Sequence, residues 1–167
     1  MTTLQYDEVA SPIGLVQFAS DDTAICWLEF FKTEGRMQSL LERRFGACEF
    51  RRGDPHDLKR RLQAYFDGEL HVLDRVPVST AGSPFQQRVW TELREIPVGA
   101  TWTYGQLAAR LGDPQACRAV GHANGQNPVS IIVPCHRVIG AGGRLTGYGG
   151  GMERKHWLLV HERAILA

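Results

Sequence analysis

The segment TYGQLAARLGDPQACRAVGHANG, residues 103–125, decides the fold of the second half of this chain. Thr103 followed three residues later by Gln106 is the pattern of a capping box, which starts a helix. That helix is expected to end near Gly112, and Asp113-Pro114 starts another one immediately. Two short helices joined by a tight turn predict a helix-turn-helix.

The second of these helices has an unusual outward face. Its inward stripe is expected to comprise Ala116, Ala119, Val120 and Ala123, which leaves Arg118, Gly121, His122 and Gly125 facing outward. Glycine weakens a helix by about 1 kcal/mol relative to alanine, so the two glycines need a reason. Two reasons stay open: close packing of another helix, or close approach of the helix backbone to a DNA groove.

A third helix precedes this pair. Ser83-Pro84-Phe85-Gln86 combines a capping serine, proline at the first helical position and glutamine three residues after the cap. The helix is expected to bury Phe85, Val89 and Leu93. Upstream, Val76 to Gly82 contains the turn-forming residues of a connection. The boundary therefore divides the chain into residues 1–82, an α/β domain, and residues 83–167, a second domain with the helix-turn-helix.

The first half alternates strand and helix patterns. Residues 4–9, 13–19 and 24–30 are short apolar segments separated by Ser-Pro and Asp-Asp turn signals, which predicts an antiparallel meander. Apolar residues then recur at helical spacing in two segments. These residues are Met37, Leu40, Leu41 and Phe45 in the first, and Leu58, Leu62, Tyr65 and Phe66 in the second, which Asp54-Pro55 opens.

Composition excludes several classes of protein. The 167 residues contain no apolar run long enough for a membrane span, and the N-terminus lacks a secretory pattern, so a cytoplasmic protein is expected. The four cysteines form no C-x-x-C pair, which argues against a disulfide framework and a cysteine-based zinc site. Residues 1–84 carry 10 Lys and Arg against 13 Asp and Glu, whereas residues 85–167 carry 9 against 5. The basic half contains the helix-turn-helix, a combination that favours nucleic-acid binding.

The stretch Ile131-Ile132-Val133-Pro134-Cys135-His136-Arg137-Val138 contains a candidate nucleophile. A β-branched run ended by proline predicts a buried strand, with Cys135 at its end. The thiolate is the reactive form of cysteine, and a nearby imidazole accepts the thiol proton. A lone Cys-His pair is more often a buried thiol beside a surface histidine, so the rest of the chain has to decide.

That stretch, with Asn127-Pro128 upstream and Gly147-Tyr148-Gly149-Gly150 downstream, resembles the active site of the O6-alkylguanine-DNA alkyltransferases. The similarity is to the bacterial single-chain type without a zinc regulatory domain. It extends over nearly the whole chain, in seven further segments: Ser11-Pro12-Ile13-Gly14, Tyr65-Phe66-Asp67-Gly68, Phe85-Gln86-Gln87-Arg88-Val89-Trp90, Ile96-Pro97, Tyr104, Arg118-Ala119-Val120-Gly121 and His161-Glu162.

The resemblance implies direct reversal of O6-alkylguanine, and of O4-alkylthymine, by one irreversible transfer of the alkyl group to Cys135. His136 would accept the thiol proton through a water and Glu162 would orient the imidazole. Tyr104 would protonate guanine N3. Asn127 would brace the active-site turn.

The resemblance also implies a DNA surface and a base pocket. Arg118 would fill the space of an extruded nucleotide, with its helix in the minor groove. The other residues of this surface would be Ala119, Gly121, His122 and Gly125, although some relatives have a tiny residue in place of His122. The base pocket would comprise Val138, Tyr148, Gly149 and Lys155. Some relatives have serine in place of Gly149, but the backbone amide directed at O6 survives this change. Arg137 is expected to make a structural ion pair.

The implied fold is α+β, with a small N-terminal antiparallel sheet and helices (RNase H-like) packed on a C-terminal winged helix-turn-helix-like domain. We expect a monomer that binds double-stranded DNA without a cofactor, metal or membrane. Two other classes of function stay open. A hydrolytic enzyme of the Cys-His-Asn type predicts turnover. A non-catalytic alkyltransferase-like or winged-helix protein predicts DNA binding alone, but such damage sensors usually lack the cysteine that is present here.

Overall fold

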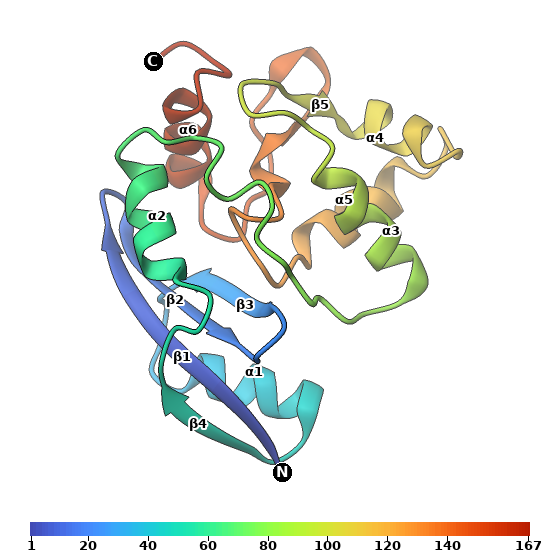
Figure 1. Ribbon diagram of the computed structural model, residues 1–167. Helices are drawn as coiled ribbons and strands as arrows, with labels where there is room; N and C mark the ends of the chain where they lie inside the picture. The colour runs from blue at the N-terminus through green and yellow to red at the C-terminus, as the bar shows by residue number, and fades with distance from the viewer. The chain divides into compact units, whose positions relative to one another are not determined.

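The computed structural model describes residues 1–167, and the chain forms two compact units, Met1–Ser79 and Thr80–Ala167 (Figure 1). The division lies three residues before the boundary proposed from the sequence. None of the helices combines the length and the hydropathy that a membrane crossing requires.

The first unit contains a four-stranded sheet in the order β3-β2-β1-β4. Three of its strands, β1 (Thr2–Ser11), β2 (Gly14–Ser20) and β3 (Ile25–Phe30), are those expected from the sequence. They pair antiparallel in chain order, with Val9 opposite Val16 and Phe18 opposite Leu28. The predicted meander is therefore confirmed.

The fourth strand, β4 (Cys48–Arg52), was missed by the sequence analysis. It pairs parallel to β1, with Leu4 opposite Phe50, so the sheet is mixed, and the expected antiparallel arrangement holds for β1, β2 and β3 only. The strand lies at the sheet edge and contains Glu49, Arg51 and Arg52 in five residues. Strands are predicted from an alternation of apolar and polar residues, and a charged edge strand shows little of this alternation.

Two helices accompany this sheet where helical spacing predicts them. α1 (Arg36–Phe45) buries Met37 and Leu41 in a cluster with Leu4 of β1 and Trp27 of β3. α2 (Leu58–Phe66) contacts β1 and buries Leu58, Leu62 and Tyr65. The carboxylate of Asp54 accepts hydrogen bonds from the amides of Leu58 and Lys59 at 2.8 and 2.7 Å, which satisfies two of the otherwise unpaired donors at the start of α2.

The second unit is built on four α-helices: α3 (Pro84–Leu93), α4 (Tyr104–Arg110), α5 (Cys117–Gly125) and α6 (Met152–His161). Both predicted capping boxes are present, at the start of α3 and of α4. α4 and α5 contact each other and α3, and the indole Nε1 of Trp90 donates a buried hydrogen bond of 2.8 Å to the carbonyl of Ala123. The helix-turn-helix expected from residues 103–125 is therefore confirmed, but its second helix begins at Cys117 and not at Asp113-Pro114.

Short elements connect these helices. β5 (Trp102–Thr103), which leads into α4, pairs parallel to β6 (Val138–Ile139), and the 3₁₀ turn η1 (Cys135–Arg137) immediately precedes β6. A second 3₁₀ turn, η2 (Ala141–Gly143), follows, and a loop leads to α6. The chain is an α+β protein, and along the sequence Cys135 lies between the helix-turn-helix and β6.

Candidate active site and DNA-binding surface

The apolar run before Cys135 is buried, but it is not a strand. Residues 131–133 form turns, with Ile132 N bonded to Ser130 O at 2.8 Å and Val133 N to Val129 O at 3.0 Å. Ile131 has φ 70°, which is rare for a β-branched residue and marks local strain. The prediction of a strand ending at Cys135 is wrong because an apolar β-branched run indicates burial whatever backbone conformation provides it. Instead, Cys135 begins η1 and is 6% exposed.

Two buried asparagines hold this turn. Asn127 Nδ2 donates to the carbonyl of Val133 at 2.7 Å, and its Oδ1 accepts from the amide of Val129 at 2.9 Å. The side chain therefore spans the strained segment, in the position expected for a brace. Asn124, on the inner face of α5, donates from Nδ2 to the carbonyl of Cys135 at 3.4 Å. Asn124 thus connects the second helix of the helix-turn-helix to the backbone of the cysteine.

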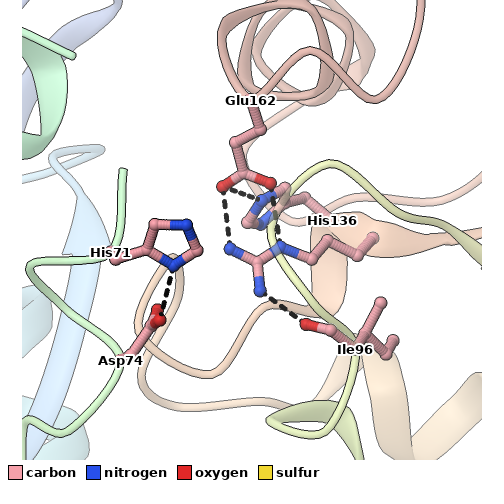
Figure 2. A network of polar contacts seen from close by, with 6 residues as sticks. His71, Asp74, Ile96, His136 and Glu162 are labelled. Carbon is pink, nitrogen blue, oxygen red and sulfur yellow. Dashed lines mark hydrogen bonds and ion pairs between the residues drawn. The ribbon is translucent and has the colours of Figure 1, made fainter. Parts of the chain in front are cut away.

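His136 follows Cys135 and lies in a buried polar cluster with Glu162, the C-cap residue directly after α6 (Figure 2). The distance from His136 Nε2 to Glu162 Oε2 is 2.9 Å, and both side chains are fully shielded from solvent. Arg137 donates to the same carboxylate through Nε at 2.8 Å and NH2 at 3.0 Å, and through NH1 to the carbonyl of Ile96 at 2.8 Å. The structural ion pair expected of Arg137 is confirmed.

This cluster fixes the charge of Glu162 and the orientation of the His136 ring. Burial raises the pKa of Glu162, but His136 and Arg137 outweigh burial and hold it well below its usual range, so Glu162 is a carboxylate. A carboxylate only accepts hydrogen bonds, hence His136 Nε2 is the donor to it. The other ring nitrogen, Nδ1, is buried and has no hydrogen-bond partner. In the neutral imidazole, Nδ1 is therefore the atom that can accept a proton.

Three of the predicted base-pocket residues form a second group beside the cysteine. Lys155 is fully buried, and its Nζ donates to the carbonyls of Val138 at 2.6 Å and Thr146 at 2.7 Å. Burial lowers the pKa of Lys155 to about 8, although the nearby Cys135 raises it. The ring of Tyr148 lies edge-on to that of His136, with centroids 6.4 Å apart. Burial, followed by Cys135, raises the pKa of Tyr148 well above 10, so its phenol stays protonated.

Tyr104 begins α4 and extends from there to the loop before α6. Its hydroxyl lies 3.4 Å from the carbonyl of Thr146, and 3.9 Å from the position that a Cβ on Gly147 would occupy. The opposite side of the ring lies against α5, where a Cβ on Gly121 would be 3.6 Å away. Lys155 and Tyr104 therefore approach the same backbone segment around Thr146. Gly149, the remaining predicted pocket residue, is exposed, and a Cβ there would meet nothing within 4 Å.

The outward face of α5 differs from the expectation at one residue. Arg118, His122 and Gly125 are exposed as predicted, and Gly121 is half-buried beside the Tyr104 ring. Ala119 is exposed as well, so its assignment to the inward stripe is wrong. The helix is rotated so that Val120, Ala123 and Asn124 are its buried residues. Asn124 was assigned to neither face of the helix in the sequence-based prediction. Its spacing would have predicted its burial, because Asn124 lies four residues after the buried Val120 and therefore on the same face of the helix.

The site is thus a cysteine with a histidine-carboxylate pair, in the same unit as a helix whose exposed face carries Arg118 and His122 among small residues. All four cysteines are free thiols. No group of three or more His, Cys, Asp or Glu residues in the described chain could hold a metal ion.

Comparisons with known proteins agree with this geometry. Residues 84–164 match the family model described as "6-O-methylguanine DNA methyltransferase, DNA binding domain". The methylated-DNA--protein-cysteine methyltransferase of Shigella flexneri is 44% identical over 170 residues, which cover 99% of each chain. The O6-methylguanine methyltransferase structure from Mycobacterium tuberculosis has a TM-score of 0.81 at 41% identity, over 96% of this chain and 93% of that one. OGT of the same organism in complex with DNA has a TM-score of 0.81 at 42% identity, over the same shares of the two chains. Because relatives well above 30% identity match the chain from end to end, it belongs to the methylated-DNA--protein-cysteine methyltransferase family.

Proposed function

We propose that this protein repairs DNA by one irreversible transfer of an alkyl group from guanine O6, and from thymine O4, to its own Cys135. The observation that supports this most directly is the orientation of His136. Its Nε2 is occupied by Glu162 at 2.9 Å, whereas its buried Nδ1 has no partner. The buried imidazole of His136 thus has one nitrogen free to accept a proton, and it is next in sequence to a cysteine that is 6% exposed. Such an arrangement activates a thiol.

In the proposed reaction, the proton of the Cys135 thiol passes through a water to Nδ1 of His136. The thiolate attacks the alkyl carbon, so that an S–C bond forms while the bond between that carbon and O6 breaks. The bonding electrons stay with guanine, and Tyr104 donates a proton to N3 of the departing anion. Glu162 stabilises the imidazolium as the acid of a catalytic triad does. The product thioether has no second nucleophile to release it, so each molecule reacts once.

The exposed face of α5 is proposed to bind double-stranded DNA through the minor groove. Arg118 is the long side chain of that face, and Ala119, Gly121 and Gly125 leave the backbone accessible. An enzyme that acts on a base has to bring it out of the stack, and a side chain that fills the vacated space favours the extruded state. His122 lies on this face in a position to contact the groove wall. Val138, Tyr148, Gly149 and Lys155 would surround the extruded base.

The second unit, with the helix-turn-helix and Cys135, would thus bind DNA and transfer the alkyl group. We propose that the protein acts as a monomer in the cytoplasm and needs no cofactor. The active form is a reduced thiol, in keeping with the four free cysteines.

Intact mass spectrometry tests the function. After incubation with an oligonucleotide that contains O6-methylguanine, the mass is expected to rise by roughly 14 Da, at Cys135 alone and once per molecule. Cys117→Ser is a matched control, because Cys117 is a half-buried thiol on α5, and it should react like the wild type. Cys135→Ser should bind DNA without gaining mass. Product formation beyond one equivalent would indicate a hydrolytic enzyme instead, and DNA binding with no transfer would indicate a damage-binding protein.

A further inference from the structure

The first unit contains a hollow that the proposed alkyl transfer does not use. It has a volume of about 350 Å³ and is lined by Pro55, His56, Asp57, Arg61, Arg75, Val76 and Pro77. All seven residues belong to the unit Met1–Ser79, from the segment that precedes α2, from α2 itself and from the turn after residue 72. The volume lies within the range of clefts that enclose small organic ligands, about 300–1,000 Å³.

The charges that line this hollow are not balanced within the protein. Arg75 makes no hydrogen bond or ion pair, and Arg61 makes only a side-chain bond of 3.3 Å from Nε to the carbonyl of His56. The acidic member of the lining, Asp57, is already paired with Arg60, which lies outside it. Other arginines of the same unit, such as Arg36 and Arg52, have carboxylate partners at 2.9 Å. Two arginines whose guanidinium groups have no carboxylate partner therefore line one cavity.

The hollow is also held in shape. Pro55 and Pro77 have fixed φ angles, and the carbonyl of Pro77 accepts a bond of 2.9 Å from the amide of Ile25 in β3. His56 is anchored by its Nε2, 2.8 Å from the carbonyl of Asp21. Asp57 has φ 54°, a left-handed conformation that few residues other than glycine, asparagine and aspartate tolerate. Such strained residues cluster at binding sites.

We propose that this hollow binds the phosphate group of a nucleotide. Guanidinium groups bind phosphate oxygens in pairs of hydrogen bonds, and the two arginines without carboxylates supply that fork here. The apolar surfaces of Pro55, Val76 and Pro77 provide the remaining wall, against which a nucleobase or sugar can bury its less polar face. The nucleotide is either free in solution or part of a DNA strand, since both present the same phosphate chemistry.

Calorimetric titrations of the full-length protein with dGMP, guanosine and inorganic phosphate test the site. We expect dGMP to bind, guanosine to bind far more weakly because it lacks the phosphate, and inorganic phosphate to bind more weakly than dGMP because it lacks the base. Arg75→Ala should lower the affinity for dGMP about 10- to 100-fold, because it removes charge-assisted hydrogen bonds to the ligand without breaking a hydrogen bond or ion pair of the folded protein. Arg61→Ala should do the same, and its thermal unfolding shows whether the fold is kept.

Two further variants separate a site from a general effect of charge. Arg43→Ala removes the same charge from the exposed surface of α1 and should leave the affinity unchanged. Asp57→Asn removes the one negative charge of the lining while keeping a residue that tolerates the left-handed conformation, so it should raise the affinity. Equal losses in Arg43→Ala and Arg75→Ala, or no binding of any probe at millimolar concentration, would overturn the proposal.

A trinucleotide and an undamaged duplex distinguish the two sources of the phosphate. If the site holds a DNA strand, the trinucleotide binds more tightly than dGMP, and Arg75→Ala reduces the slope of log affinity against log salt on the duplex by about 0.9 per lost phosphate contact. If the site holds a free nucleotide, dGMP binds at least as tightly as the trinucleotide and the slope does not change. Neither result depends on alkyl transfer by Cys135.

Discussion

Nε2 of His136 lies 2.9 Å from Oε2 of Glu162, and neither side chain has any exposure to solvent. The same carboxylate is bonded by Arg137 at two points, 2.8 and 3.0 Å away. A buried carboxylate with three donors is held in one orientation, and it holds the imidazole in one tautomer in turn. The free Nδ1 of His136 follows from this arrangement, so the chemistry proposed for Cys135 depends on a residue 27 positions away in the chain.

The first prediction concerns the rate of transfer. Glu162→Gln keeps the shape of the side chain but removes the charge that stabilises the imidazolium, so the single-turnover rate should fall about 100- to 10,000-fold without reaching zero. Quench-flow measurements on a duplex with O6-methylguanine give this rate. Glu29→Gln is the control, because Glu29 makes a partly exposed ion pair with Arg36 in the first unit. An unchanged rate in Glu162→Gln would remove Glu162 from the mechanism.

The same pair predicts how stability depends on pH. Although burial raises it, the pKa of Glu162 in the folded protein is held below its ordinary value of 4.5 by His136 and Arg137. The unfolded chain therefore binds a proton at a higher pH than the folded chain does. The stabilisation is complete above about pH 5 and is lost as the pH falls from there towards the folded-state pKa.

Urea unfolding at about pH 7 and about pH 3.5 measures this effect. Glu162→Gln should lower the free energy of unfolding by about 3–5 kcal/mol at neutral pH, because it leaves Arg137 buried without its carboxylate. It should also lose less stability on acidification than the wild type does. If both proteins lost the same free energy between the two pH values, the ion pair would not be the source of the acid sensitivity.

Local signals predicted much of this fold, and tertiary effects account for what they missed. The capping boxes at Ser83 and Thr103 involve residues three apart, so the sequence contains all the information needed to start α3 and α4. β4 depends on pairing with Leu4 and its neighbours more than forty residues away, and its own charged sequence gives no such signal. The turn at Ile131 depends on hydrogen bonds made by the side chain of Asn127, and the pattern of apolar residues does not predict these bonds either.

The candidate site divides in the same way. Cys135 and His136 were candidates from the residue pattern and Glu162 from the family resemblance, whereas the tautomer of His136 required the hydrogen bond to Glu162. The sequence of α5 does not show which side of the helix is buried, because it is rich in alanine and glycine and these small residues fit either the buried or the exposed face. This is why Ala119 was assigned to the wrong face and Asn124 was overlooked.

Asn124 gives a prediction that separates positioning from stability. Its Nδ2 bonds the carbonyl of Cys135, while its buried Oδ1 has no partner. Asn124→Leu keeps the number and branching of the side-chain heavy atoms and removes both polar atoms. The loss of the unpaired Oδ1 offsets part of the cost of fitting the larger methyl groups, so the free energy of unfolding should change by less than about 1.5 kcal/mol. The transfer rate should nevertheless fall, because the backbone of the nucleophile is no longer tied to α5. Equal transfer rates in Asn124→Leu and the wild type would show that the 3.4 Å bond does not position Cys135.

Tyr104 is predicted to act on the leaving group. Tyr104→Phe keeps the ring that packs against Gly121 but removes the hydroxyl near Thr146. The affinity for duplex DNA should therefore be retained while the single-turnover rate falls, as expected for the loss of a donor to the guanine anion. Fluorescence anisotropy with Cys135→Ser as the background measures binding without reaction. A loss of affinity as large as the loss of rate would make Tyr104 a DNA-backbone contact instead.

The last prediction concerns Arg118, the long side chain on the exposed face of α5. Extruding a base costs a few kcal/mol, and a side chain that fills the vacated space offsets part of that cost. The benefit is largest where the base is stacked and paired, smaller in a single strand and absent for a free base. Arg118→Ala should therefore slow repair of O6-methylguanine strongly in a duplex, less in a single strand, and hardly at all for free O6-benzylguanine.

An arginine that only contacted phosphates would give another pattern. It would weaken binding to damaged and undamaged DNA alike. Its removal would reduce the slope of log affinity against log salt by about 0.9, the value for one phosphate contact. Single-turnover rates on the three substrates, each measured at saturating protein, distinguish the two roles because saturation removes the contribution of affinity. A loss of the same size on all three substrates would exclude extrusion and would point to a general effect of Arg118 on the fold around Cys135.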